Sequence, residues 1–176
     1  RVKVSWPKTR EAFRGRWCTA GIDLSATDDL TCVVYLFPYD EDRNRVDILM
    51  HAFCPKAKLR DRKNKYKDLY IAWERQNWIH TTAGNAIDYD FVRAAILDDV
   101  QYFDVGLFGI DRQFDGVEFT TKLADEIGHT EKTPKVITTT NGPQKIGPIC
   151  QEFERRLLEN KLNHGGNPVL RWMIDN

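Results

Sequence analysis

The chain lacks the features that mark secreted, zinc-dependent and membrane proteins. Its four cysteines are widely spaced along 176 residues and form no C-x-x-C pair. Because a disulfide framework or a zinc site needs clustered ligands, we expect reduced thiols in a cytosolic protein. The longest apolar runs, such as Cys32–Pro38, have only the length of a strand, and Arg1–Arg16 has no apolar core segment. We therefore expect neither a membrane span nor a signal peptide.

The chain also lacks net charge, since 26 basic residues balance 26 acidic ones. This balance argues against a protein coated in basic surface. The charge is nevertheless uneven, because Lys56–Lys67 carries seven basic residues against one acid and Arg1–Arg16 carries six against one. A local basic stripe of this kind fits phosphate contacts confined to one face, and it fits a solvated helix face equally well.

Nucleotide-binding motifs and repeats are absent as well. No G-x-x-x-x-G-K-[ST] phosphate loop occurs, so we do not expect this chain by itself to hydrolyse ATP. The four histidines are scattered without zinc spacing. What the chain does have is 41% hydrophobic and 11% aromatic residues, the composition of a packed globular domain.

Hydrophobic periodicity predicts three strands followed by alternating helices and strands. Runs rich in β-branched and aromatic residues predict the three strands over Trp17–Leu24, Thr31–Pro38 and Arg45–Cys54, and the short connections between them are typical of an antiparallel meander. Apolar stripes of period 3.6 and short apolar runs then predict four helices and two more strands. The helices lie around Tyr66–Trp73, Val92–Phe103, Phe119–Ile127 and Ile149–Leu157, and the strands cover Val105–Ile110 and Lys135–Thr140.

Two details of this pattern concern the ends of elements. Trp78–Asp88 reads as a loop that contains a short extended piece. Pro148 suits the first turn of the last helix, and Asn163–Gly166 suits its end.

This order of elements predicts an α/β domain of the ribonuclease H-like type. Because parallel crossovers through helices are right-handed, the fourth and fifth strands should join the sheet beside the first. We therefore predict a mixed five-stranded sheet of order 3-2-1-4-5 flanked by helices. The domain would span residues 17–176, and residues 1–16 would form a linker or docking arm.

Two strands of this layout end on the same tripeptide, Gly-Ile-Asp. Asp23 ends the first strand and Asp111 ends the fourth. If these strands are parallel neighbours, their aspartates emerge side by side, about 5 Å apart at the backbone. Two anions so close repel each other unless a cation lies between them. Hard oxygen ligands favour Mg²⁺ or Mn²⁺, and two such ions are suited to phosphodiester hydrolysis.

Each aspartate on its own has a simpler interpretation. A single aspartate at the end of a strand is more often a turn former or a helix cap than a metal ligand. It is the paired occurrence, at the carboxyl ends of strands where open α/β sheets bind ligands, that favours a site. Other polar residues are weaker candidates. Asp88 and Asp90 suit a helix cap, and Arg112 could reach a scissile phosphate or form an outward salt bridge.

Four segments of the chain are similar to one known family. They are GIDLSATDDLTCVVYLFP (Gly21–Pro38), AGNAIDYDFVRAAILDD (Ala83–Asp99), FGIDR (Phe108–Arg112) and LLENKLNHGGNPVLRWMIDN (Leu157–Asn176). Together they resemble the nuclease domain of the large terminase subunit of tailed bacteriophages. The resemblance extends from Trp17 to Asn176, and its last segment is the most specific, because resolvases and transposases of the same fold share the Gly-Ile-Asp pieces.

The resemblance implies a component of a viral packaging motor. An upstream ATPase domain would drive DNA into the capsid, and this domain would cut concatemeric double-stranded DNA with two Mg²⁺ or Mn²⁺ ions. The family's first two metal-binding acids map onto Asp23 and Asp111. The third is expected on a helix after the N-P-V-L-x-W segment, beyond Asn176, with Asp175, in the stretch before that helix, as the weaker alternative within the chain.

The resemblance also implies partners and a location. Lys58, Arg60, Arg62, Lys63 and Arg112 are the candidate DNA contacts. Further partners would be the small terminase subunit and the portal or procapsid, in the host cell cytoplasm and away from any membrane. Two alternatives stay open: a resolvase or transposase of the same fold, which would prefer branched DNA, and a non-catalytic module that docks on DNA or on a portal.

Overall fold

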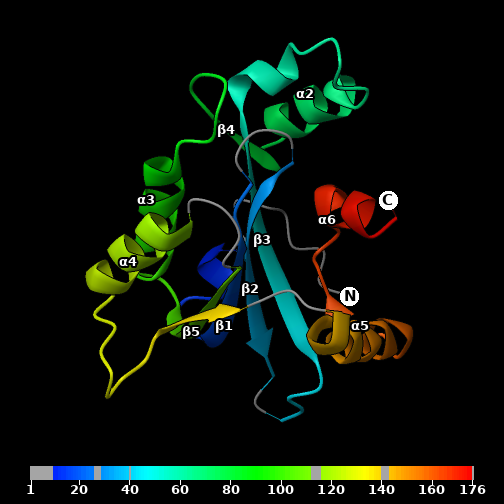
Figure 1. Cartoon of the computed structure of the whole chain (residues 1–176). Helices are drawn as coiled ribbons and strands as arrows, with labels where there is room; N and C mark the ends of the chain where they lie inside the picture. The colour runs from blue at the N-terminus through cyan, green and yellow to red at the C-terminus, as the bar shows by residue number, and fades with distance from the viewer. Residues whose placement is uncertain (1–9, 26–28, 40, 112–115, 140–142, 176) are drawn as a thin grey trace.

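The computed structural model describes residues 10–25, 29–39, 41–111, 116–139 and 143–175, apart from the side chains of Gly116, Pro143 and Lys145. Strands and helices alternate after an initial meander of three strands (Figure 1). In chain order they are β1 (Trp17–Asp23), β2 (Thr31–Pro38), β3 (Val46–Pro55), the 3-10 helix η1 (Lys56–Leu59), α2 (Lys67–Arg75), β4 (Ile79–Thr82), α3 (Tyr89–Asp99), β5 (Asp104–Asp111), α4 (Gly116–Glu126), β6 (Val136–Thr139), α5 (Pro143–Leu158), β7 (Leu162–Asn163) and α6 (Pro168–Asp175).

The strands form one mixed sheet in the order β4-β3-β2-β1-β5-β6, and the short β7 also pairs with β3. The meander β1-β2-β3 is antiparallel, whereas β5 lies parallel to β1 and β6 lies parallel to β5. The five predicted strands therefore lie in the predicted order, and the ribonuclease H-like class is confirmed. The predicted number of strands was wrong, because β4 and β7 extend the sheet along the outer edge of β3.

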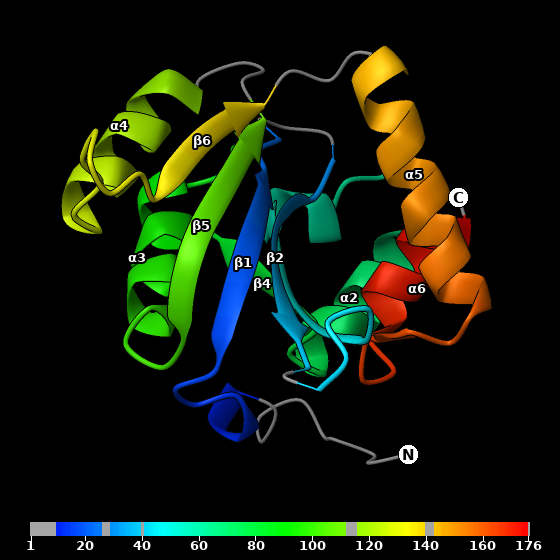
Figure 2. The same ribbon diagram turned by 90° about the horizontal axis from the view of Figure 1, so that it is seen from below.

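Alternating side chains divide the core into two layers, one on each face of the sheet. Cys18, Ala20 and Ile22 of β1 point into the larger layer, which includes buried residues of α3 and α4. Cys32 of β2 and Met50 of β3 point into the smaller layer, which contains residues of α2 and α6. Figures 1 and 2 show α3 and α4 on one face of the sheet and α5 and α6 on the other. None of the described helices is long and apolar enough to cross a membrane.

Three predicted boundaries near helices were wrong. The predicted helix around Val92–Phe103 ends at Asp99, and Phe103 instead joins the core just before β5. Pro148 lies inside α5, which begins at Pro143 and ends at Leu158, before the predicted Asn163–Gly166. The segment around Asp175, expected to lie outside a helix, is itself helical over Pro168–Asp175, and Val169 anchors it in the smaller core layer. A proline fits the first turn of a helix best. Inside a helix, as at Pro148, it removes one backbone hydrogen bond.

The described part of the N-terminal arm lies against the domain. Phe13 is buried and stacks on Phe37, with 4.3 Å between the ring centroids. The Gly15 amide donates to the Tyr102 carbonyl at 2.6 Å, and the Arg16 guanidinium donates to the Asp47 carboxylate at 2.8 Å. Apolar stacking and a partly buried ion pair thus fasten the arm to the sheet.

Candidate functional site

Asp23 and Asp111 end two strands that are parallel neighbours. The register pairs Gly21 with Gly109 and Ile22 with Ile110, so the aspartates follow at equivalent positions. Neighbouring strands lie about 4.8 Å apart, which brings the two backbones to that separation here. Ile22 and Ile110 are buried in the larger core layer. Because successive side chains alternate, both aspartates project from the opposite face of the sheet.

Two glycines leave space beside these carboxylates. Gly21 and Gly109 lie two residues before the aspartates and therefore on the same face. A Cβ atom added at Gly21 would have no described atom within 4 Å, and one added at Gly109 would meet only the Ala20 carbonyl oxygen, at 3.9 Å. Among the described residues, the backbone beside the carboxylates is therefore uncrowded.

The electrostatics of the pair are those of two crowded anions. Desolvation raises the pKa of the Asp23 carboxyl, and the neighbouring charges of Asp111 and then Asp29 raise it further. Asp23 retains solvent access, so water screens part of this repulsion. A divalent cation would reverse this repulsion, and carboxylate oxygens are the ligands that Mg²⁺ and Mn²⁺ prefer. The donor set at this edge therefore fits such an ion.

The turn after β1 keeps Asp29 near this edge. The Ser25 amide donates to the Thr31 hydroxyl at 2.9 Å, and the Asp29 amide donates to the Ser25 hydroxyl at 3.1 Å. From α3, the Tyr89 hydroxyl donates to the Ser25 carbonyl at 3.2 Å. Asp29 is thereby held close enough to Asp23 for its charge to act on that carboxyl.

The other predicted acids occupy different positions. Asp88 caps α3, because its carboxylate accepts from the amides of Asp90 and Phe91, which confirms its predicted structural role. Asp175 is the exposed last residue of α6. Within the described ranges, no group of three or more acidic, histidine or cysteine residues is arranged to hold a metal ion. The structure thus brings Asp23 and Asp111 together without adding Asp175 to them.

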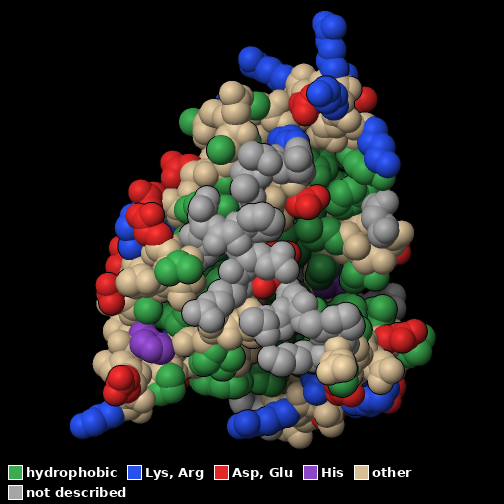
Figure 3. Space-filling model, viewed as in Figure 1, with side chains coloured by type: hydrophobic (Ala, Val, Ile, Leu, Met, Phe, Trp, Pro, Cys, Tyr) green, Lys and Arg blue, Asp and Glu red, His purple; other side chains and the backbone are tan. Residues whose placement is uncertain are grey.

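The predicted basic contacts lie on η1 and the loop that follows it. Arg60, Arg62 and Lys63 are exposed. The Lys58 side chain is less exposed, and its Nζ lies 4.0 Å from an Asp61 carboxylate oxygen. Figure 3 shows lysine and arginine side chains gathered at the end of the molecule where Figure 1 draws α2. Arg112 falls outside the described residues.

The sheet order and the paired aspartates define an α/β domain of the ribonuclease H-like class. More narrowly, the chain belongs to the family described as "Terminase large subunit, endonuclease domain", whose model matches residues 4–176. It is 30% identical over 151 residues to the large terminase subunit of Enterobacteria phage HK97, an alignment that covers 86% of this chain and 29% of that protein.

A solved structure agrees with this assignment. The crystal structure of the HK97 bacteriophage large terminase superimposes with a TM-score of 0.74 and 28% identity, covering 96% of this chain and 35% of that one. The chain thus spans about a third of the length of the relatives it matches.

Proposed function

We propose that this domain is a metal-dependent endonuclease that cuts concatemeric double-stranded viral DNA during genome packaging. The family assignment supports a nuclease of the packaging machinery. The observation that carries the metal dependence is the placement of Asp23 and Asp111 at equivalent ends of paired parallel strands. Their charges raise the free energy of the empty site, and that repulsion is what a bound cation would relieve.

Asp23 and Asp111 would hold two Mg²⁺ or Mn²⁺ ions, with Asp23 contributing to both. When bound, such ions activate a water molecule and stabilise the leaving oxygen of a phosphodiester. The protein's own part is to fix two carboxylates on rigid strands at one spacing. Glycines at positions 21 and 109 place no side chain beside these carboxylates. Exposed Arg60, Arg62 and Lys63, together with Lys58, would bind DNA phosphates without reading sequence.

Plasmid cleavage with Mn²⁺ tests this proposal. The wild-type protein is expected to convert supercoiled plasmid to open-circular and linear forms, and Asp23→Ala is expected to abolish that conversion. Asp125→Ala is a matched control, because Asp125 is an exposed acid on α4. Cleavage by Asp23→Ala at the wild-type rate would overturn the metal assignment.

The remaining parts of the proposal follow from the family. Double-stranded DNA would be the substrate, and the small terminase subunit, the portal or procapsid and an upstream ATPase domain would be partners. Residues 1–16 would be the linker or docking arm from that ATPase domain, and residues 17–176 the nuclease domain. The place of action would be the host cell cytoplasm.

One observation favours a second candidate, a non-catalytic module that docks on DNA or on a portal. In the part of the chain that the structure describes, the two aspartates have no third ligand arranged with them. Titration calorimetry distinguishes the candidates. Heat from Mn²⁺ binding that disappears in Asp23→Ala supports the nuclease, and the absence of any such heat in the wild-type protein supports docking.

A further inference from the structure

A groove of about 760 Å³ lies between η1 and the loop that joins β4 to α3. Its walls come from two segments of the chain, Lys56–Asp61 on one side and Gly84–Asn85 on the other; the lining residues are Lys56, Ala57, Lys58, Arg60, Asp61, Gly84 and Asn85. Three of the seven are basic and one is acidic. Nothing in the sequence places the loop residues Gly84 and Asn85 beside the basic stretch.

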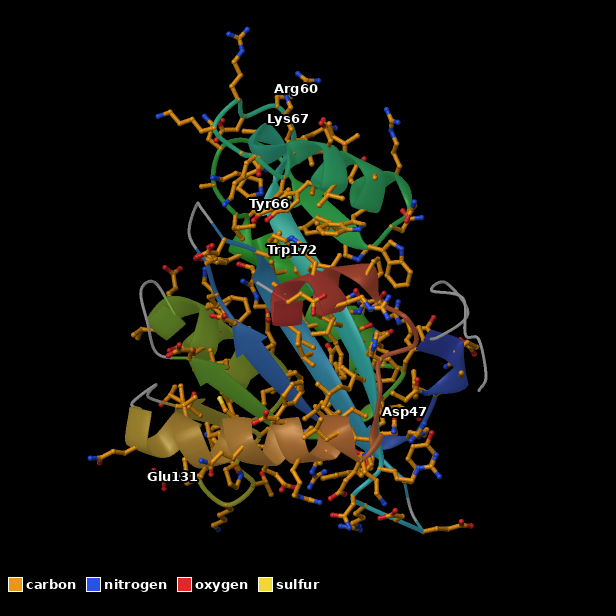
Figure 4. The ribbon with its side chains drawn as sticks, turned by 90° about the vertical axis from the view of Figure 1, so that its right-hand side faces the viewer. Asp47, Arg60, Tyr66, Lys67, Glu131 and Trp172 are labelled. Carbon is orange, nitrogen blue, oxygen red and sulfur yellow. The ribbon has the colours of Figure 1, made fainter. Side chains whose placement is uncertain are left out.

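The basic wall is held in shape by its own polar residues. The Asp61 carboxylate accepts from the Lys63 amide at 2.8 Å, and the Asn64 side chain both donates to the Lys58 carbonyl at 3.2 Å and accepts from the Tyr66 amide at 2.9 Å. These short side chains bind the backbone, whereas Arg60 extends into solvent at one end of the molecule (Figure 4). The basic groups are thus presented on an ordered loop, which reduces the entropy lost on binding.

The opposite wall is ordered as well. The Ala57 amide donates to the Gly84 carbonyl at 3.3 Å and joins the two walls. Thr82, which is 2% exposed, donates to the Ala86 carbonyl at 3.4 Å and accepts from the Asp88 amide at 3.2 Å. Gly84 has φ +89°, a conformation that side-chain-bearing residues rarely adopt. The groove is therefore built into the backbone.

The groove and the paired aspartates share one edge of the sheet. The strand register runs from Asp23 to Cys32 and Ala52, and from there to Ile79 of β4. Because β3 and β4 run in the same direction as β1, the groove lies beyond their carboxyl ends. Two to three strand spacings across and about four residues along place it roughly 15–20 Å from Asp23. That distance is about half a turn of duplex DNA, whose full turn is about 34–36 Å.

We propose that this groove binds the phosphate backbone of duplex DNA about half a helical turn, or roughly five base pairs, from the bond that is cut. This inference rests on the proposed function for its substrate and adds the position and the residues of a second contact. Lys56 and Arg60 would lie against phosphates, with Lys58 held by Asp61 at the base of the groove. Phosphate contacts position a protein on the duplex without reading sequence, which suits a cutter of low specificity.

Binding to a labelled 40-base-pair duplex in EDTA tests the groove independently of cleavage. The double variant Lys56→Glu/Arg60→Glu is expected to bind on the order of 100-fold more weakly at low salt. The slope of its log binding constant against log salt concentration should become shallower by about 0.9 for each lost phosphate contact. The matched control is Arg43→Glu/Lys132→Glu, with the same charge change at exposed residues near the opposite end of the sheet. The control is expected to bind within about twofold of wild type if the groove is the main contact.

Mapping the cut positions on short end-labelled duplexes tests the spacing. The wild-type protein should avoid cutting within about five base pairs of the end that would occupy the groove, because the groove would then be empty. The groove variant should lose this avoidance and cut more slowly. If the groove variant, with its fold verified by circular dichroism, bound the duplex with wild-type affinity, the proposal would be overturned. The proposal would also be overturned if the wild-type groove bound inorganic phosphate while the groove variant kept its affinity for the duplex. If the wild-type protein cut no plasmid and the groove variant still lost duplex binding, the proposed nuclease function would be refuted and the proposed DNA contact would be supported.

Discussion

The two ends of the sheet place carboxylates in opposite surroundings. At the start of β3, Asp47 is 6% exposed and accepts hydrogen bonds from Arg16 at 2.8 Å, Tyr39 at 2.9 Å and Asn163 at 2.8 Å. At the end of β1, the charges that most affect Asp23 are those of other acids, Asp111 and Asp29. Figure 4 shows Asp47 far from Arg60, which lies toward the other end of the molecule.

The comparison separates structural acids from candidate functional ones. A carboxylate that three donors satisfy stabilises the fold, because its desolvation is balanced by charge-assisted hydrogen bonds. Neighbouring carboxylates that repel each other reduce the stability of the metal-free protein, and a bound cation would relieve that repulsion. Substitutions at the two ends should accordingly separate activity from stability.

The largest expected effect is on cleavage. Asp23→Asn and Asp111→Asn should each lower the rate of plasmid cutting on the order of 10³-fold, since each removes a charged oxygen from the metal centre. Asp47→Asn should leave the rate per folded molecule near that of the wild type. Initial rates at saturating Mn²⁺ provide the measurement. A comparable loss of rate in Asp47→Asn would erase the distinction between the two ends.

The free energy of unfolding should change more on substitution of Asp47 than on substitution of Asp23. Asp47→Ala is expected to lower the free energy of unfolding by about 2–4 kcal/mol, because it leaves Arg16 part-buried without its counter-ion. Asp23→Asn should not lower it in EDTA. The sign follows from the raised pKa of Asp23, whose ionised form is disfavoured in the folded state at neutral pH. Urea titrations of both variants at pH 7 measure these differences, and equal destabilisation would contradict the prediction.

Bound metal should stabilise the protein through the aspartate pair and not through Asp47. At a free Mn²⁺ concentration about 100 times the dissociation constant, the wild-type protein should gain about 2.7 kcal/mol of unfolding free energy, and EDTA should remove the gain. Asp23→Asn should show little of this stabilisation, and the more conservative Asp47→Asn should retain it. Thermal melts with and without EDTA distinguish the outcomes. A Mn²⁺-dependent shift that persists in Asp23→Asn would place the ion elsewhere.

The paired aspartates were predictable because both tripeptides carry the same local signal, Gly-Ile-Asp at the end of an apolar run. The crossover rule then placed the two strands together, and the observed register confirms that placement. The hydrogen-bond donors around Asp47 were not predictable. Its donors Arg16 and Asn163 lie 31 and 116 residues away in sequence, and no periodicity records such pairs.

The extra strands and the α5 boundary failed for local reasons. Strand β4 has the sequence IHTT, in which three of the four residues are polar, and it is too short for an alternating pattern to stand out. Strand β7 has only two residues and forms because β3 offers it an edge. Pro148 indicated a helix start by intrinsic preference, but α5 begins one and a half turns earlier.

A second buried carboxylate, Asp99, lies next to two histidines and allows a smaller test. It lies 3.0 Å from both the Arg10 Nε and the His51 Nε2, and the second nitrogen of His51 lies 3.4 Å from the His80 Nε2. Sequence reasoning gave these scattered histidines no shared site. Burial, and then the charge of His51, lower the pKa of His80 to about 4, although Asp99 opposes the shift.

Because the pKa of His80 is lower in the folded state than in the unfolded chain, the unfolded chain binds more protons between about pH 6.5 and pH 4. Stability should therefore fall as the pH is lowered through this window, on the order of 3 kcal/mol for this group. His80→Gln should flatten that part of the curve. His164→Gln serves for comparison, since burial also lowers the pKa of His164, by less. Urea titrations at pH 7, 6, 5 and 4 give the slopes. An unchanged slope in His80→Gln would mean that acid destabilises the protein through other groups.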